Sequence, residues 1–500
     1  MHAPIAYLFN GQTIATADVP LVPMAQLRQG VIELVAGGGH LSAFFAVGAE
    51  ECFRMHAVVC VPQREQLAVL AADVSGDYPA LTPECWPANW FEREIYEQTG
   101  IRPTAHRWLK PIRFQPRGRR AAVAAVAAVG DLDFFSMQGA EVHEVAVGPV
   151  HAGVIEPGHF RFQCHGETVH HLEISLGYQH RGIERAMAGG PDRRSLHYMQ
   201  TLAGDSTIGH SGAYCAVMEA LGEIQIPRAA ETVRAAAAEL ERMANHIGDL
   251  GAMAGDVGFL PTLNYCGRIR GDVLNLTALI CGNRFGRGLL SPGGVRFGLD
   301  EERRRKLLQG LASVQKDLGS ALALMFDTPS VVARLEGTGV LSTDLARRIG
   351  LVGPAARACG LLNDVRSQLP YGAYRFDIVP AAAYPSGDCF ARAYVRWLEL
   401  DQSLAFIRRQ LAAPGLEDGL LKPCPPPLPD RMVVALTEGF RGEICHVAAT
   451  DRNGRFAFYK VIDPSFHNWF GLAQALRGQQ ISDFPLCNKS FNLSYCGHDQ

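Results

Sequence analysis

The sequence predicts an α+β protein with a small N-terminal α/β domain, followed by a mainly helical bundle domain that has a small β-sheet at its start. Short apolar runs at 57–61 and 67–74 alternate with polar segments near the N-terminus, which is typical of strands. Helical periodicity dominates the later part of the chain. Because 500 residues exceed the size at which one core keeps growing, we expect domains at 1–115 and 140–500, joined by a linker at 116–139.

The N-terminal domain should close with an amphipathic helix over 90–99. Gly100 ends this helix, because glycine readily adopts the left-handed conformation of a helix C-terminus. The segment that follows, 116–139, is basic and then alanine-rich, so we interpret it as a linker or a connecting helix.

The second domain should begin with strands near 145–148 and 160–163. Residues of one helical face then recur at three- and four-residue spacing, as at Glu239, Arg242, Met243, His246 and Leu250, which predicts long helices packed as a bundle. The expected helices are 195–222, 228–253, 264–284, 301–327 and 388–411. The proline-rich run 423–429 marks a loop.

Composition excludes several classes of function. The net charge of -3 lacks the clustered basic excess of a nucleic-acid-binding protein, so no nucleic-acid partner is expected. The longest bland apolar run, 121–130, is half the roughly 20 residues of a spanning helix, and the N-terminus lacks a secretory signal. We therefore expect a cytoplasmic protein that reaches a membrane only through partners.

The cysteine and glycine patterns exclude common cofactor sites. The 13 cysteines contain no CxxC pair, which argues against a zinc ribbon, a thioredoxin-like centre or a locally bound iron-sulfur cluster. No GxGxxG motif follows a predicted strand and opens a helix, so binding of NAD is not expected.

Longer motifs carry a family resemblance. The segment FEREIYE at 91–97, followed by Gly100, Ile101 and His106, resembles the 30 kDa subunit of respiratory complex I. Residues 140–500 resemble the 49 kDa subunit and, more closely, the large subunit of energy-converting hydrogenases such as formate hydrogenlyase, in which both modules are fused in this order. The blocks are GPVHAGVIEPGHFRF (148–162), GYQHRGIE (177–184), ELERMANHIGDLG (239–251), NRFGRGLLSPGG (283–294), GLVGPAARACG (350–360), EGFRGEICH (438–446) and DPSFHNWFGL (463–472).

The resemblance implies a nickel–iron (NiFe) centre held by four cysteine thiolates, which are soft ligands suited to nickel. The four corresponding positions here are Ala203, Ser206, Leu493 and Cys496, so we do not expect NiFe and expect no complete redox cofactor on this chain. An alternative is a rebuilt metal site. It would use Cys215, Cys487, Cys496, His210 and His498, which otherwise are buried packing or hydrogen-bonded residues.

The resemblance also implies other parts of a hydrogenase-type pocket. Glu156 matches the proton-passing glutamate and Arg441 the arginine over the iron; both could serve proton-coupled chemistry, or could be a structural hydrogen bond and ion pair. His180, Arg181 and Glu184 should surround the site or lie at an interface, and His210 is a further cofactor-binding candidate.

The resemblance also implies a possible quinone site. His159 matches a histidine that donates a hydrogen bond to the quinone in the 49 kDa subunit. The matching tyrosine position is Gly204, which has no side-chain donor; Tyr198 or Tyr178 could substitute. Direct quinone reduction is therefore weakly supported.

The resemblance implies a subunit of a multi-subunit oxidoreductase on the inner face of the plasma membrane. It would couple electron and proton transfer to the membrane subunits of an ion-pumping arm. A small subunit similar to the 20 kDa subunit of complex I should carry a 4Fe-4S cluster and dock near 148–210, and a formate dehydrogenase could be a further partner. The alternatives are a working hydrogenase with an atypical metal site, a quinone-binding subunit similar to those of NADH dehydrogenase, and a non-catalytic scaffold.

Overall fold

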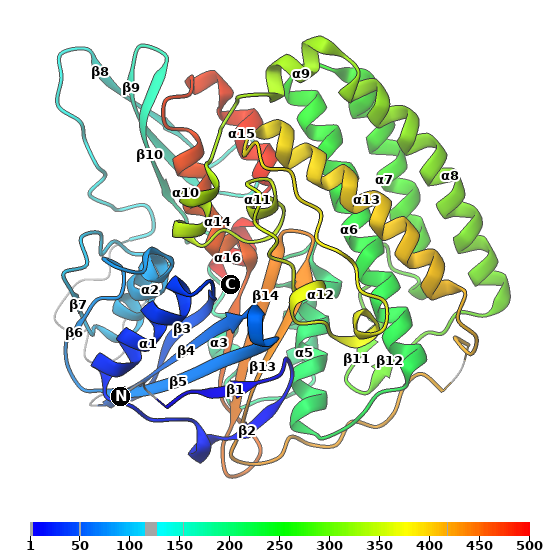
Figure 1. Cartoon of the computed structure of the whole chain (residues 1–500), viewed down its shortest axis with the longest axis horizontal. Coiled ribbons are helices and arrows are strands. Elements are labelled where there is room, and N and C mark those ends of the chain that lie inside the picture. Colours follow the sequence, from blue (N-terminus) through cyan, green and yellow to red (C-terminus); the bar gives the residue numbers. More distant parts are fainter. Residues whose placement is uncertain (1–3, 50–51, 116–127, 154, 418) are drawn as a thin grey trace.

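A four-stranded antiparallel sheet forms the centre of the N-terminal part of the chain (Figure 1). The computed structural model describes residues 4–49, 52–115, 128–153, 155–417 and 419–500. The sheet has the order β1-β5-β4-β3, with β1 at Ala6–Leu8, β3 at His40–Ala49, β4 at Cys52–Val61 and β5 at Gln66–Val74. The apolar runs expected to be strands lie in β4 and β5. Helices α1 (Met24–Ala36) and α2 (Asn89–Thr99) pack against the sheet, and Gly100 ends α2 with a φ of 78°.

A three-stranded antiparallel sheet opens the second part, as the sequence predicts. Its order is β10-β9-β8, with β8 at Val142–Val147, β9 at His159–His165 and β10 at Thr168–Ser175. Residues 116–127 of the expected linker lie outside the described residues. Residues 128–139 form neither helix nor strand, so this part of the linker is not a connecting helix.

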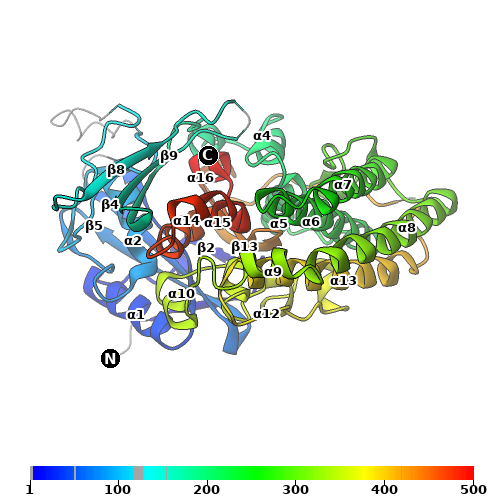
Figure 2. The same cartoon turned by 90° about the horizontal axis from the view of Figure 1, so that it is seen from above.

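Long helices pack side by side at the other end of the molecule (Figure 2). They are α6 (Arg228–Asp256), α7 (Leu260–Cys281), α8 (Glu301–Phe326) and α13 (Cys389–Leu411). Helix α6 packs against α7 and α13, because its apolar stripe is wide enough to bury contacts on two sides. The helix expected over 195–222 is two helices, α4 (Ser195–Thr201) and α5 (Thr207–Leu221), separated by a turn at 202–206.

A second four-stranded sheet, which the sequence did not predict, runs through the middle of the molecule (Figure 1). It is antiparallel with the order β15-β14-β13-β2, from β2 (Thr13–Ala15), β13 (Arg431–Gly439), β14 (Gly442–Thr450) and β15 (Phe456–Ile462). All nine residues of β14 are buried, so the polar alternation that usually identifies a strand is weak. Strand β2 comes from the N-terminal part and pairs with β13, joining the two parts of the chain.

The C-terminal residues pack between the two parts (Figure 2). They form α14 (Pro464–Ala475), α15 (Phe484–Phe491) and α16 (Tyr495–Asp499). The shorter elements are β6 (Tyr78–Pro79), β7 (Pro103–Thr104), α3 (Ile183–Met187), β11 (Leu290–Ser291), β12 (Gly294–Val295), α9 (Pro329–Leu335), α10 (Thr343–Ile349), α11 (Gly353–Arg357) and α12 (Val365–Gln368). Among the helices of the described residues, none has the length and hydropathy needed to span a bilayer.

Candidate functional site

The turn between α4 and α5 meets the segment that leads into α16. Arg181 joins the two: its guanidinium donates to the carbonyl oxygens of Thr201 at 2.9 Å, Leu202 at 2.6 Å and Cys496 at 3.3 Å. The turn itself is closed by the Ser206 amide, which donates to the Ala203 carbonyl at 2.9 Å. The two segments that the resemblance assigns to metal ligands are therefore neighbours in space.

Glu156 lies beside the Cys496 thiol. Its Oε2 accepts from the Tyr495 amide at 3.3 Å, and Ser494 Oγ lies 3.5 Å from Cys496 Sγ. Burial raises the pKa of Cys496 to about 12, and the charge of Glu156 and its hydrogen bond add to this rise. Cys496 is therefore a neutral thiol at physiological pH.

Arg441, at the turn between β13 and β14, ties the same two segments together from another side. Its two terminal nitrogens each lie 2.8 Å from an oxygen of Asp205, and its Nε donates to the Asn492 carbonyl. Burial works against charge at both groups, but the ion pair prevails: it lowers the pKa of Asp205 and raises that of Arg441. The negative charge of Asp205 therefore balances the positive charge of the Arg441 guanidinium inside the protein.

The four expected ligand positions supply one sulfur. Ala203, Ser206 and Leu493 are buried, and Cys496 is partly buried. A methyl, a hydroxyl, an isobutyl group and one thiol do not fit the four-thiolate set that the resemblance implies for nickel.

The alternative metal site of five residues is not assembled. Cys487 Sγ lies 3.9 Å from Cys389 Sγ, and Cys215 is buried near the charges of Arg234 and Glu219. His498 bonds Asp499 at 2.9 Å and stacks on Phe466. The interpretation of these residues as packing and hydrogen-bonded groups agrees with these contacts.

His210 belongs to a buried chain of hydrogen bonds. Its Nε2 lies 3.0 Å from Asp463 Oδ2 and its Nδ1 lies 3.1 Å from His446 Nε2; His446 Nδ1 lies 2.8 Å from the Tyr459 hydroxyl. One set of tautomers satisfies every contact: Tyr459 donates to His446, His446 to His210, and His210 to an ionised Asp463. Burial by itself would raise the pKa of Asp463, but the hydrogen bond from His210 and the charge of Arg441 help to lower it, which agrees with an ionised Asp463.

The remaining candidate histidines have other contacts. His159 Nε2 accepts from Arg161 Nε at 3.2 Å, and its ring lies 5.1 Å from that of Phe134. Since consecutive residues of a strand face opposite sides, His159 points away from the side on which Phe160 packs against Tyr495. Burial lowers the pKa of both His159 and His180, and His180 Nδ1 lies 2.7 Å from the Asp499 carbonyl. The structure therefore does not bring His159 together with Glu156 and Arg441.

A cavity of about 490 Å³ lies between the β8–β9 connection and α15. Leu493, one of the four expected ligand positions, lines it with mostly apolar neighbours. Its polar lining includes His151, whose Nε2 lies 2.9 Å from the Gly158 carbonyl, Lys489, and Tyr495, whose buried hydroxyl interacts with the Asn488 side chain but has no hydrogen-bond partner within 3.5 Å among the described residues. The sequence interpretation missed these residues. His151 lies within the 148–162 block, but only the folded chain shows that it faces a cavity. Tyr178, a proposed substitute, lies against Gly130 instead.

Comparisons with known proteins agree with the motifs. Residues 26–118 match the family described as respiratory-chain NADH dehydrogenase, 30 Kd subunit, and residues 256–422 match the 49 Kd subunit. The chain is 32% identical to the carbon monoxide-induced hydrogenase of Rhodospirillum rubrum over 353 residues, which are 70% of this chain and 97% of that protein. The chain belongs to the family of complex I 49 kDa subunits and membrane-bound hydrogenase large subunits.

Two further relatives support this assignment. Hydrogenase-4 component G of Escherichia coli is 27% identical over 484 residues, 92% of this chain and 81% of that protein. NADH-quinone oxidoreductase subunit 4 of Thermus thermophilus is 30% identical over 370 residues, 69% of this chain and 90% of that protein. This chain is thus a fused 30 kDa- and 49 kDa-like subunit of a complex I or membrane-bound hydrogenase-family oxidoreductase.

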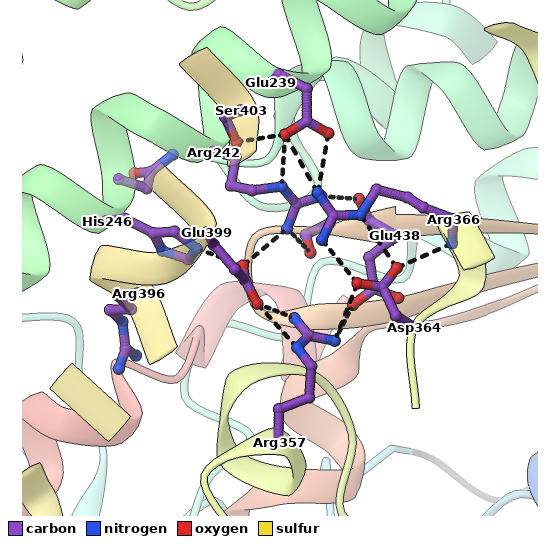
Figure 3. A network of polar contacts seen from close by, with 12 residues as sticks. Glu239, Arg242, His246, Arg357, Asp364, Arg366, Arg396, Glu399, Ser403 and Glu438 are labelled. Atoms are coloured by element: carbon purple, nitrogen blue, oxygen red, sulfur yellow. Dashed lines mark hydrogen bonds and ion pairs between the residues drawn. The ribbon is translucent and has the colours of Figure 1, made fainter. Parts of the chain in front are cut away.

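Residues from three of the sequence blocks, 239–251, 350–360 and 438–446, meet in a buried network of ion pairs (Figure 3). Arg357 contacts Glu399 at 2.6 Å and Glu438 at 2.8 Å, while Arg366 contacts Glu239 at 3.1 Å and Asp364 at 2.6 Å. With Arg242, the cluster has three guanidinium groups and four carboxyl groups. Burial, and then the charge of Asp364, raise the pKa of Glu438 to about 7. Such a network fixes how α6, α13 and β13 pack, because each charge needs its partner in place.

Proposed function

We propose that this chain is a subunit of a membrane-associated oxidoreductase that couples electron and proton transfer to ion-pumping membrane partners, without a NiFe centre. The observation that carries the proposal is the donor set around Cys496. The expected ligand positions meet there, yet they offer a single sulfur atom, and Asp205 in the same turn is held in an ion pair with Arg441. Nickel bound by soft thiolates requires more sulfur donors than this.

Proton transfer is the chemistry that these residues support. Glu156 lies in a partly buried position beside Cys496, where a carboxyl group can take up and release a proton. The chain from Asp463 through His210 and His446 to Tyr459 supplies consecutive donors and acceptors in the protein interior. We propose that both groups serve proton movement during electron transfer by the complex.

Metal analysis of the complex isolated from its native membranes tests the absence of NiFe. Nickel measured by inductively coupled plasma mass spectrometry should be far below one atom per chain, and hydrogen-dependent dye reduction should be absent. One nickel per chain together with hydrogen oxidation would establish the working hydrogenase instead.

The role of Glu156 is tested by Glu156→Gln, which keeps the shape and removes the exchangeable proton. With an added quinone as the electron acceptor, we expect the complex-dependent oxidation of a reduced viologen by membranes carrying the complex to fall at least about 100-fold, the lower end of the range for general acid–base catalysis. The matched control is Glu141→Gln, because Glu141 is exposed and pairs only with His165 in the same sheet. Unchanged activity in Glu156→Gln would favour the scaffold.

An iron-sulfur small subunit is the proposed electron partner. Val150 and Ile155, in the β8–β9 connection, are 74% and 51% exposed, and a partner similar to the 20 kDa subunit of complex I would cover them. The proposed location is the inner face of the plasma membrane. Replacing both residues by aspartate should cause the 4Fe-4S partner to be lost when the complex is purified, whereas Val340→Asp, at an exposed valine elsewhere, should not.

Quinone binding in the 490 Å³ cavity is a second candidate function. The observation that favours it is a mostly apolar lining with a histidine and a tyrosine hydroxyl as potential hydrogen-bond donors, His151 and Tyr495. A photoreactive quinone analogue should label peptides from 147–160 or 484–495, and Tyr495→Phe should weaken that labelling. Labelling confined to other subunits would reject this candidate.

A further inference from the structure

Three potential metal ligands converge where the N-terminal sheet meets the C-terminal sheet. His40 is the first residue of β3, Glu443 lies in β14 and His467 lies in α14. One ligand atom from each lies within 4.8 Å of the others, and His40 Nε2 is 3.7 Å from Glu443 Oε1. Among the residues that the structure describes, no other group of three or more histidine, cysteine or acidic side chains meets this criterion.

The ligand atoms are buried and lack partners. His40 Nε2, Glu443 Oε1 and His467 Nε2 have no hydrogen-bond partner within 3.5 Å among the described residues, although the Ser42 hydroxyl interacts with the Glu443 carboxyl. Glu443 and His467 are each 7% exposed, and His40 closes the cluster with a side chain that is 11% exposed. Since buried polar atoms in folded proteins are normally satisfied, three unsatisfied atoms that face one another indicate a missing ligand.

The chemistry of the donor set identifies the class of ligand. Two imidazole nitrogens and one carboxylate oxygen are borderline donors suited to zinc and its neighbours in the first transition series. Atoms bound at about 2.0–2.2 Å to a tetrahedral ion lie roughly 3.3–3.6 Å apart, so His40 and Glu443 are already near this spacing, and His467 would have to approach by up to roughly 1.5 Å. A small cavity lined by His40, Glu443 and Cys60 adjoins the cluster and leaves room for about one water as the fourth ligand.

We propose that His40, Glu443 and His467 bind one divalent metal ion of the zinc class, which fastens the N-terminal sheet to the C-terminal sheet and helix. The three ligands come from distant segments of the chain, so the bound ion would stabilise the folded arrangement against separation of these elements. The site is distinct from the segments at 203–206 and 493–496.

Metal titration of the purified full-length chain, without a histidine tag, tests the proposal. After chelation, the wild type should bind one Zn²⁺, and Co²⁺ should give the intense visible bands of a tetrahedral site. His40→Gln and His467→Gln should each weaken Co²⁺ affinity at least about 100-fold, more than the 10- to 100-fold typical of losing a supporting residue. Zn²⁺ should raise the melting temperature of the wild type but of neither variant.

His56→Gln is the matched control. His56 is a buried histidine of β4 in the same sheet, its Nδ1 also lacks a partner, and its ring packs between Phe45 and Phe458 outside the cluster. This variant should bind Co²⁺ as the wild type does. Equal Co²⁺ binding in the wild type and His40→Gln, or no binding to the folded wild type, would overturn the proposal.

The experiment also separates this site from the question of NiFe, because nickel can occupy imidazole and carboxylate ligands. Nickel that is lost in His40→Gln is bound by the cluster of His40, Glu443 and His467. Nickel that remains in that variant would contradict the proposed function, and the Co²⁺ titration then decides whether the cluster binds a metal.

Discussion

Arg441 and Asp205 form a two-point ion pair, with both terminal nitrogens of the guanidinium 2.8 Å from the two carboxylate oxygens. The pair joins the β13–β14 turn to the turn between α4 and α5. It therefore fixes the relative position of two of the segments that surround Cys496.

Arg441→Met should destabilise the protein by about 1–3 kcal/mol, because Asp205 would lose its partner; partial exposure of Asp205 keeps the cost below that of a fully buried pair. Arg441→Lys should recover part of the lost stability, since lysine keeps the positive charge but cannot contact both carboxylate oxygens through two nitrogens. Chemical denaturation of the chain measures both. A double variant with Asp205→Asn should be more stable than Arg441→Met alone.

Gly353 sets the backbone position of Arg441. Its φ is 63°, and an added Cβ would lie 2.0 Å from the Arg441 carbonyl oxygen. Gly353→Ala should therefore cost more than the roughly 1 kcal/mol of glycine-to-alanine strain at a positive φ. Gly337→Ala is the control, because its φ is 70° and its Cβ would meet nothing within 4 Å. Equal losses of melting temperature would show that the Arg441 contact has no effect.

The buried network of Figure 3 should be far less tolerant than surface ion pairs. Arg357→Met removes the partner of Glu399 and Glu438 in a fully buried cluster, so we expect a loss of about 3–5 kcal/mol. Arg409→Met breaks the half-exposed pair with Asp377 and should cost below about 1 kcal/mol. Urea unfolding of both variants provides the comparison, and similar midpoints would contradict the expectation.

Glu241 should make stability fall as pH rises. Burial raises the pKa of its carboxyl to about 8, although the Ile208 and Gly209 amides donate to it. Between pH 4.5 and about 8 the folded state holds a proton that the unfolded state releases, so its stabilising contribution is complete below pH 4.5 and lost by pH 8. Glu241→Gln should leave the melting temperature nearly unchanged at about pH 5 and raise it relative to the wild type at about pH 9. A parallel pH profile for the two proteins would contradict the raised pKa.

The sequence alone determined the α+β class, the long helices and the family. Helices such as α6 and α8 can be predicted from the local periodicity of apolar residues, which does not depend on the segments that the helices contact in the fold. The motif blocks also located Glu156 and Arg441, and the resemblance placed the four expected ligand positions in short contiguous segments outside those blocks.

Tertiary structure decided the pairing of distant segments. The sheet of β2, β13, β14 and β15 has central strands that are buried on both faces, so they lack the alternation that would predict them. The cluster of His40, Glu443 and His467 and the cavity beside Tyr495 arise from contacts across hundreds of residues. The spacing of residues along the sequence does not predict such contacts. The free energy of burying each polar group depends on its hydrogen-bond partners, and these partners come together only in the folded chain.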